Sequence, residues 1–151
     1  MIFTTDTDLS AVADGMIART LPKDRWTHAA HFAAAVWIVM RRPDLVAERD
    51  MPGLIRAYNE SVGGENTDTA GYHETITQAS LVAVRAAVAE GGSPAEVLRR
   101  LLERHGRSDW LLQHWSRERL FSVEARRGWV EPDLAPLQAF PTGEGRPPVL
   151  P

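Results

Sequence analysis

The segment Trp26–Met40, WTHAAHFAAAVWIVM, most constrains the fold of this chain. Across residues 29–40, His31 is the one polar residue, so a helix here has no face suited to water. A helix that is apolar all round is buried, with other helices packed around it, or else it spans a membrane. The strongly apolar run covers nine residues, 32–40, whereas a membrane span needs about 20. We therefore predict a buried central helix over about residues 27–42.

Four further stretches place apolar side chains three and four residues apart, the spacing typical of amphipathic helices. They are residues 7–19, 50–62, 72–90 and 94–105. The clearest local signature is Ser93-Pro94-Ala95-Glu96, a capping box with proline at the first helical position. Two short helices are expected to begin at Ser108 and Ser116. No segment alternates like a strand, so we predict an all-α fold with six to eight helices around the central one.

The last part of the chain has a different composition. The final 22 residues contain six prolines and no helical period. We therefore divide the chain into a helical domain, residues 1–130, and an extended C-terminal tail, residues 131–151. The tail is expected to pack on its own domain or on a neighbouring molecule, with Leu134, Leu137 and Phe140 as anchors.

Composition excludes several classes of function. The chain has no cysteine, which removes disulfides, thiolate zinc sites and cysteine nucleophiles. Its acidic beginning lacks the features of a signal peptide, so we expect a soluble, cytoplasmic protein without membrane contact. A net charge of −3 argues against a nucleic-acid partner. No P-loop, G-x-S-x-G elbow or dinucleotide fingerprint occurs either.

A pair of histidines opens the central helix. His28 and His31 are three residues apart and share one helical face. They can provide two ligands to a divalent metal such as zinc, with His73 as the third. Glu74 would then serve as an extra ligand or general base, and His73 itself is a candidate catalytic base. The alternative is structural: neutral histidines that bond loop carbonyls at a helix start.

A second candidate site lies between residues 116 and 127. Eight arginines occur over residues 99–127, against four acidic residues. If Ser116 caps a helix, free backbone N–H groups beside Arg117 and Arg119 make an anion site, with Ser122 on the same face. The alternative is a solvated helix with ordinary ion pairs.

Two aromatic residues are further candidates for ligand binding. Trp26 and Tyr72 adjoin the histidines in the sequence and would wall a pocket. Packing in the core is the alternative for Trp26. The polar loop before Tyr72 is by default a set of capping turns.

Three blocks carry a resemblance to known proteins. They are W-T-H-A-A-H (26–31), G-Y-H-E-T (71–75) and S-R-E-R-L-F-S (116–122), the last followed by E-A-R and W-V-E-P-D-L. With these blocks the chain resembles a group of small bacterial all-helical proteins over nearly its whole length. The resemblance implies a self-contained domain and makes a common site for the three blocks more plausible. It implies no particular activity.

Two hypotheses for function follow. The first is a small enzyme or binding protein whose histidine-lined pocket takes a metal or a small anionic ligand, with metal-assisted hydrolysis as the reaction. The second is a non-enzymatic domain that associates through its tail, with a homo-oligomer as one form. The sequence does not identify a substrate.

Overall fold

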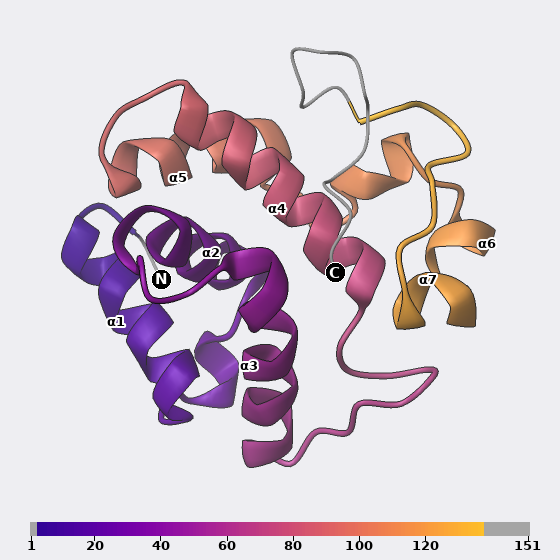
Figure 1. The fold of residues 1–151 in the computed structure, drawn as a ribbon, viewed down its shortest axis with the longest axis horizontal. Helices are drawn as coiled ribbons and strands as arrows, with labels where there is room; N and C mark the ends of the chain where they lie inside the picture. The colour runs from indigo at the N-terminus through magenta and orange to yellow at the C-terminus, as the bar shows by residue number, and fades with distance from the viewer. Residues whose placement is uncertain (1–2, 138–151) are drawn as a thin grey trace.

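The computed structural model describes residues 3–137, and these form seven α-helices and two 3-10 turns (Figure 1). No strand occurs in this range, so the predicted all-α fold is confirmed. In chain order the elements are α1 (Asp6–Ala18), η1 (Lys23–Arg25), α2 (His28–Arg41), α3 (Ala47–Ser61), α4 (Glu74–Ala89), α5 (Pro94–His105), η2 (Trp110–Gln113), α6 (Arg117–Leu120) and α7 (Val123–Arg127).

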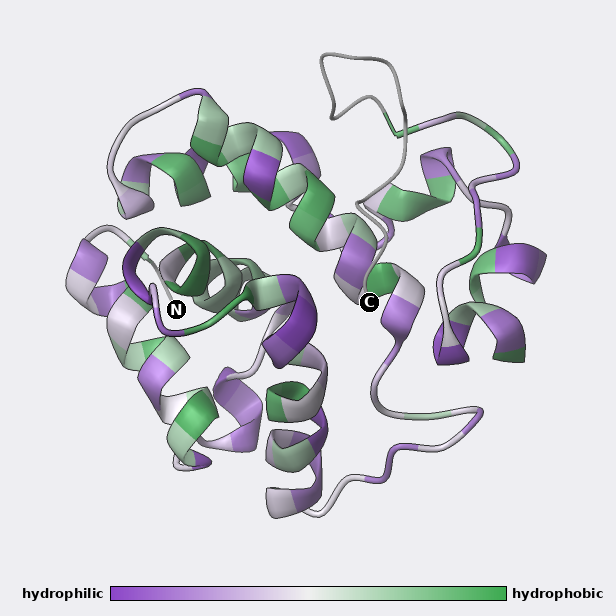
Figure 2. Ribbon diagram, viewed as in Figure 1, coloured by the Kyte–Doolittle hydropathy of each residue, from purple (hydrophilic) through white to green (hydrophobic). Residues whose placement is uncertain are grey.

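Helix α2 is the predicted central helix. It contacts α1, α3, α4 and α5, and Figure 2 shows it hydrophobic along most of its length. Ala30, Ala33 and Ala34 are fully buried, and their small side chains let neighbouring helices approach closely. The helix begins where the side chain of Thr27 accepts a hydrogen bond from the N–H of Ala30.

Helix α4 lies between the two parts of the molecule. In Figure 1, α1, α2, α3 and α5 lie on one side of it, and α6 and α7 lie on the other. It contacts α2, α3 and α5 as well as α7. Its first turn therefore faces the C-terminal helices, and its middle faces the core.

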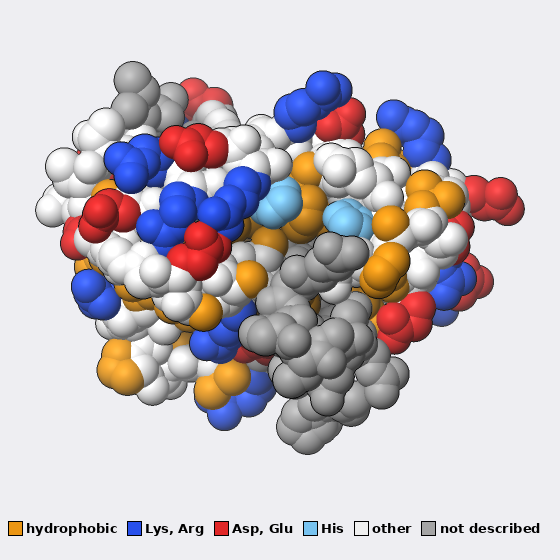
Figure 3. All heavy atoms as spheres, turned by 90° about the horizontal axis from the view of Figure 1, so that it is seen from above, with side chains coloured by type: hydrophobic (Ala, Val, Ile, Leu, Met, Phe, Trp, Pro, Cys, Tyr) orange, Lys and Arg blue, Asp and Glu red, His pale blue; other side chains and the backbone are white. Residues whose placement is uncertain are grey.

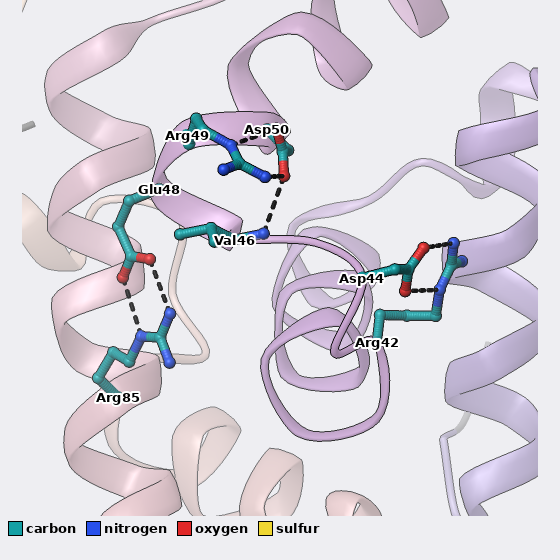
Figure 4. Close-up of polar contacts among 7 residues, drawn as sticks. All are labelled: Arg42, Asp44, Val46, Glu48, Arg49, Asp50 and Arg85. Atoms are coloured by element: carbon teal, nitrogen blue, oxygen red, sulfur yellow. Dashed lines mark hydrogen bonds and ion pairs between the residues drawn. The ribbon is translucent and has the colours of Figure 1, made fainter. Parts of the chain in front are cut away.

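Helix α3 begins three residues before the predicted start, and Pro52 lies inside it. The carboxylate of Asp50 accepts a hydrogen bond from the N–H of Val46 (2.8 Å) and so caps an earlier start (Figure 4). Proline has no N–H for the carbonyl four residues back, which belongs to Glu48. Gln78 Nε2 on α4 donates to that carbonyl instead (3.1 Å). The prediction failed because this compensation comes from another helix.

An ion pair joins α3 to α4. Arg85 donates two hydrogen bonds to the carboxylate of Glu48, at 2.9 and 2.7 Å (Figure 4). Glu48 is 8% exposed, and these bonds hold the pKa of its carboxyl below the usual range. The two helices that this pair connects are also two walls of the pocket described below.

The start of the tail packs on its own domain. Trp115 Nε1 donates to the carbonyl of Val130 (3.0 Å), and the N–H of Leu134 donates to the carbonyl of His114 (2.9 Å). Leu137 is 4% exposed and is an anchor as predicted, whereas Leu134 is 60% exposed and is not. The third predicted anchor, Phe140, lies outside the described residues.

The two short helices before the tail differ from the prediction. The first is a 3-10 turn that begins at Trp110 after Asp109, rather than a helix capped by Ser108. Ser116 caps α6 as predicted, but this helix ends at Leu120. Ser122 then caps a separate helix, α7.

Candidate functional site

A pocket of about 300 Å³ lies between α2, α3, α4 and the η2 segment. This volume is at the lower end of the range for small-molecule sites, roughly 300–1,000 Å³. Among the described residues that line it, none is acidic, and none is lysine or arginine. The lining residues are His28, His31, Phe32, Ala35, Met51, Ile55, Ile76, Thr77, Ser80, Leu81, Ser108, Trp110 and Leu111.

His31 is the most unusual polar group of the pocket. Its Nδ1–H donates to the carbonyl of Thr27 one turn earlier (2.7 Å). A carbonyl can only accept, so in the neutral ring the proton is on Nδ1 and Nε2 carries a lone pair. No hydrogen bond joins this Nε2 to any residue within 3–137. The ring of Trp26 stacks on that of His31 with centroids 3.9 Å apart.

Burial lowers the pKa of His31 to about 4, against an ordinary value of 6.5. The bond to the Thr27 carbonyl opposes this shift, and the nearby His28 adds to it. By accessible surface, however, His31 is an exposed residue, and its ring lines the open pocket. The side chains packed around the ring still limit the water that can solvate an imidazolium. His31 is therefore neutral at pH 7.

His28 lies beside His31 in the pocket wall. Its Nε2 donates to the carbonyl of His105 at the end of α5 (2.8 Å). Its ring meets Phe32 edge-on, with centroids 5.1 Å apart. Like His31, it uses one ring nitrogen to bond the backbone, and that bond fixes the orientation of the ring.

His73 does not join this pair. As the N-cap of α4, its Nδ1 accepts from the N–H of Ile76 (3.1 Å), and its Nε2–H donates to the carbonyl of Leu120 (2.7 Å). It is 7% exposed, it does not line the pocket, and burial lowers its pKa. Both ring nitrogens are occupied, so His73 has no lone pair to offer a metal or a substrate proton.

The predicted three-histidine metal centre is therefore not formed. Within residues 3–137, no group of three His, Cys, Asp or Glu side chains is arranged to hold a metal ion. The physical reason is that the backbone of Leu120, 47 residues away in the chain, occupies the nitrogen that His73 would contribute. His28 and His31 share a pocket, as the spacing predicts, but without their third ligand.

Glu74 and Tyr72 also lie outside the lining of the pocket. The hydroxyl of Tyr72 donates to Glu74 Oε1 (2.5 Å), and Gln78 Nε2 lies 3.3 Å from Glu74 Oε2. Burial raises the pKa of Tyr72, so its hydroxyl keeps its proton. Arg56 lies over the Tyr72 ring, 4.5 Å from the centroid. This network supports α4 from outside the pocket, and the prediction of a catalytic Glu74 gains no support.

Trp26 supports the site without lining it. Its ring lies between those of His31 and Tyr58, with the Tyr58 centroid at 5.3 Å. The Tyr58 hydroxyl donates to the carbonyl of Leu21 (2.8 Å) and so holds this stack in place. The indole N–H of Trp26 is buried and has no hydrogen-bond partner among residues 3–137. Trp26 thus positions His31 and does not contact the pocket itself.

The predicted anion site already contains a carboxylate of the chain, that of Asp133. The backbone N–H and hydroxyl of Ser116 both donate to the carboxylate of Asp133, each at 2.7 Å. Arg119 Nε donates to the carbonyl of Glu131, and Ser122 caps α7. Arg117 is exposed at the surface. Asp133, 17 residues further along, already supplies a carboxylate there, so the structure gives the prediction of an anion site no support.

Two of the three sequence blocks meet, but not at the pocket. His73 of the second block bonds Leu120 of the third, and α4 packs against α7. Arg126 also donates to the carbonyl of Gly71, which anchors the polar loop (2.8 Å). The first block alone contributes to the pocket, so the idea of one shared site is not supported.

Sequence analysis did not identify several of the residues that line the pocket. Ser80, Ser108, Met51 and Trp110 come from separate elements, and no spacing connects them. His105, the last residue of α5, packs against Trp110 with ring centroids 4.0 Å apart. Burial lowers its pKa. Figure 3 shows histidine and hydrophobic side chains next to one another on the face seen from above.

Comparison with known proteins adds no family to these observations. No protein-family model, curated protein or solved structure matches the chain. The resemblance to small bacterial helical proteins therefore stays a prediction. None of the helices in residues 3–137 has the length and hydropathy that crossing a membrane requires.

Proposed function

We propose that this protein binds a small, mainly apolar molecule in the pocket between α2, α3, α4 and η2. The observation that carries the proposal is a cavity of about 300 Å³ with apolar walls from four elements and two oriented histidines. Largely apolar cavities with a few well-placed polar groups are the usual form of ligand sites. At the second polar region, around Ser116, the carboxylate of Asp133 already bonds the backbone N–H and hydroxyl that would hold an anion.

Hydrolysis in the same pocket is the second candidate. The hydroxyls of Thr77, Ser80 and Ser108 share the lining with His31, so a nucleophile and a base lie in one cavity. A general base works best when its pKa is near the working pH. His31, with a pKa of about 4, is a weak base at neutral pH. Binding is therefore the better supported function, and an anionic or metal ligand gains no support from the lining.

The association hypothesis gains no support from the described part of the tail. Residues 130–137 pack on their own domain through Trp115, Ser116 and His114. A homo-oligomer stays a prediction, which light scattering after size-exclusion chromatography would test.

Titration with p-xylene, followed by two-dimensional ¹H–¹⁵N NMR, tests the proposed function. We expect saturable shifts at pocket residues, including the Trp110 indole. Ser80→Leu should abolish them because the larger side chain fills the cavity. Ala86→Leu, on the same helix but outside the lining, is the matched control and should bind normally. Shifts that are absent, or that persist unchanged in Ser80→Leu, would overturn the proposal.

A further inference from the structure

The described lining of the pocket carries no charged side chain. Among residues 3–137, no aspartate, glutamate, lysine or arginine lines it. A carboxylate or an ammonium group that entered it would lose water without gaining a counter-ion, and this is strongly unfavourable. A neutral molecule meets no such penalty.

The polar side chains of the pocket favour a ligand that donates a hydrogen bond. Thr27 holds the His31 proton on Nδ1, so Nε2 accepts and does not donate. The hydroxyls of Ser80, Thr77 and Ser108 can both donate and accept, so they do not select between ligands. The two histidines make the selection, because each donates one ring N–H to a carbonyl and keeps an acceptor nitrogen that a ligand with only acceptors leaves unpaired. Of the two, His31 is the ring that packs against Trp26.

The acceptor is also held in place. Trp26 stacks on His31, Tyr58 lies behind Trp26, and the Tyr58 hydroxyl is bonded to the Leu21 carbonyl. A ring fixed on one face and by one hydrogen bond loses little freedom when a ligand binds. Such preorganisation strengthens both affinity and selectivity.

From these contacts we propose that the ligand is a neutral aromatic-sized molecule with a hydroxyl or N–H group, which donates its hydrogen bond to His31 Nε2. Its apolar body lies against the walls formed by Phe32, Leu81 and Trp110. This inference rests on the proposed function, which requires only that the pocket binds small apolar molecules.

The test compares p-cresol with p-xylene, in which a methyl group replaces the hydroxyl at nearly the same size. Dissociation constants for both are measured by NMR in the unmodified protein and in His31→Phe. The ratio of the p-xylene constant to the p-cresol constant should fall about five- to tenfold in His31→Phe, because one hydrogen bond is lost. Ser80→Ala, which removes another polar group of the lining, should leave the ratio unchanged.

Three outcomes would contradict the inference, and they are distinguishable. If the ratio is the same in His31→Phe and the unmodified protein, the donor assignment is wrong, although the pocket stands. If 4-methylbenzoate or 4-methylbenzylammonium binds as tightly as p-cresol, the claim of neutrality is wrong. If neither p-cresol nor p-xylene binds, the proposed function fails together with the inference.

Discussion

Helices α2 and α4 both carry a histidine in or next to their first turn, and burial lowers the pKa of both imidazoles. At α4, the two nitrogens of His73 bond Ile76 and Leu120, and the side chain is nearly inaccessible. At α2, only one nitrogen of His31 is used, and the ring lines a cavity. The same residue at the same kind of helix end is structural in one place and available to a ligand in the other.

The difference shows that the chemistry of a histidine is decided by the groups opposite it. A helix start favours a neutral imidazole at both sites, because the positive end of the helix dipole disfavours imidazolium. At α4, the N–H of Ile76 uses the lone pair of His73, and the Leu120 carbonyl of α6 uses its proton. At α2, the ring of His31 lines the open space between α3, α4 and η2, and one of its nitrogens keeps its lone pair.

The largest expected effect is on stability. His73→Ala removes the partners of a backbone N–H and of a backbone carbonyl in a buried place, which should cost about 2–4 kcal/mol. His31→Ala removes one bond at an accessible site and should cost less than about 1 kcal/mol. Urea denaturation of the two variants measures this. His73→Asn keeps a capping acceptor and should recover part of the stability that His73→Ala loses. Equal losses of stability in His73→Ala and His31→Ala would contradict the comparison.

The second expected effect is on pH dependence. The pKa of His31 falls from 6.5 in the unfolded chain to about 4 in the folded protein, and the pKa of His73 also falls. Below pH 6.5 the unfolded chain therefore binds more protons than the folded protein does, and protonation favours unfolding. The stability that the two neutral histidines contribute is fully present above pH 6.5. It is lost as the pH falls from 6.5 toward the folded pKa values.

Denaturation at about pH 7 and about pH 5 should show the unmodified protein less stable at the lower pH, and His31→Phe less sensitive to the change. NMR titration of the imidazole carbons should give both histidines a pKa below 6.5. A normal value at His31 would show that its ring is solvated like a surface histidine.

The smallest effect is expected at a third helix start. Asp133→Asn removes the charge that bonds the N–H and hydroxyl of Ser116 at α6. Because Asp133 is exposed, the melting temperature should fall only slightly, and less than in His73→Ala. Added salt should narrow the difference between Asp133→Asn and the unmodified protein, since ions screen the lost charge. No change at any salt concentration would show that this carboxylate does not hold the tail.

Sequence reasoning succeeded where the cause of a structure is local. The capping box at Ser93 forms as predicted, with Glu96 bonding back to the N–H of Ser93. It failed where a compensating group is distant, as at Pro52, which the helix tolerates because Gln78 replaces the missing bond to Glu48. The pocket was foreseen only in its two histidines, because its other walls come from separate elements.

The amino-acid sequence by itself determined an all-helical domain around the buried helix α2, because hydrophobic period and capping act within a few residues. It also determined that His28 and His31 lie together, since they are neighbours on one turn. Tertiary structure decided that the second nitrogen of His73 bonds Leu120, that Asp133 lies at the predicted anion site and that His31 lines a cavity. Leu120 lies 47 residues from His73 in the chain, and Asp133 lies 17 residues from Ser116. Such contacts depend on how the helices pack, and no local pattern encodes them.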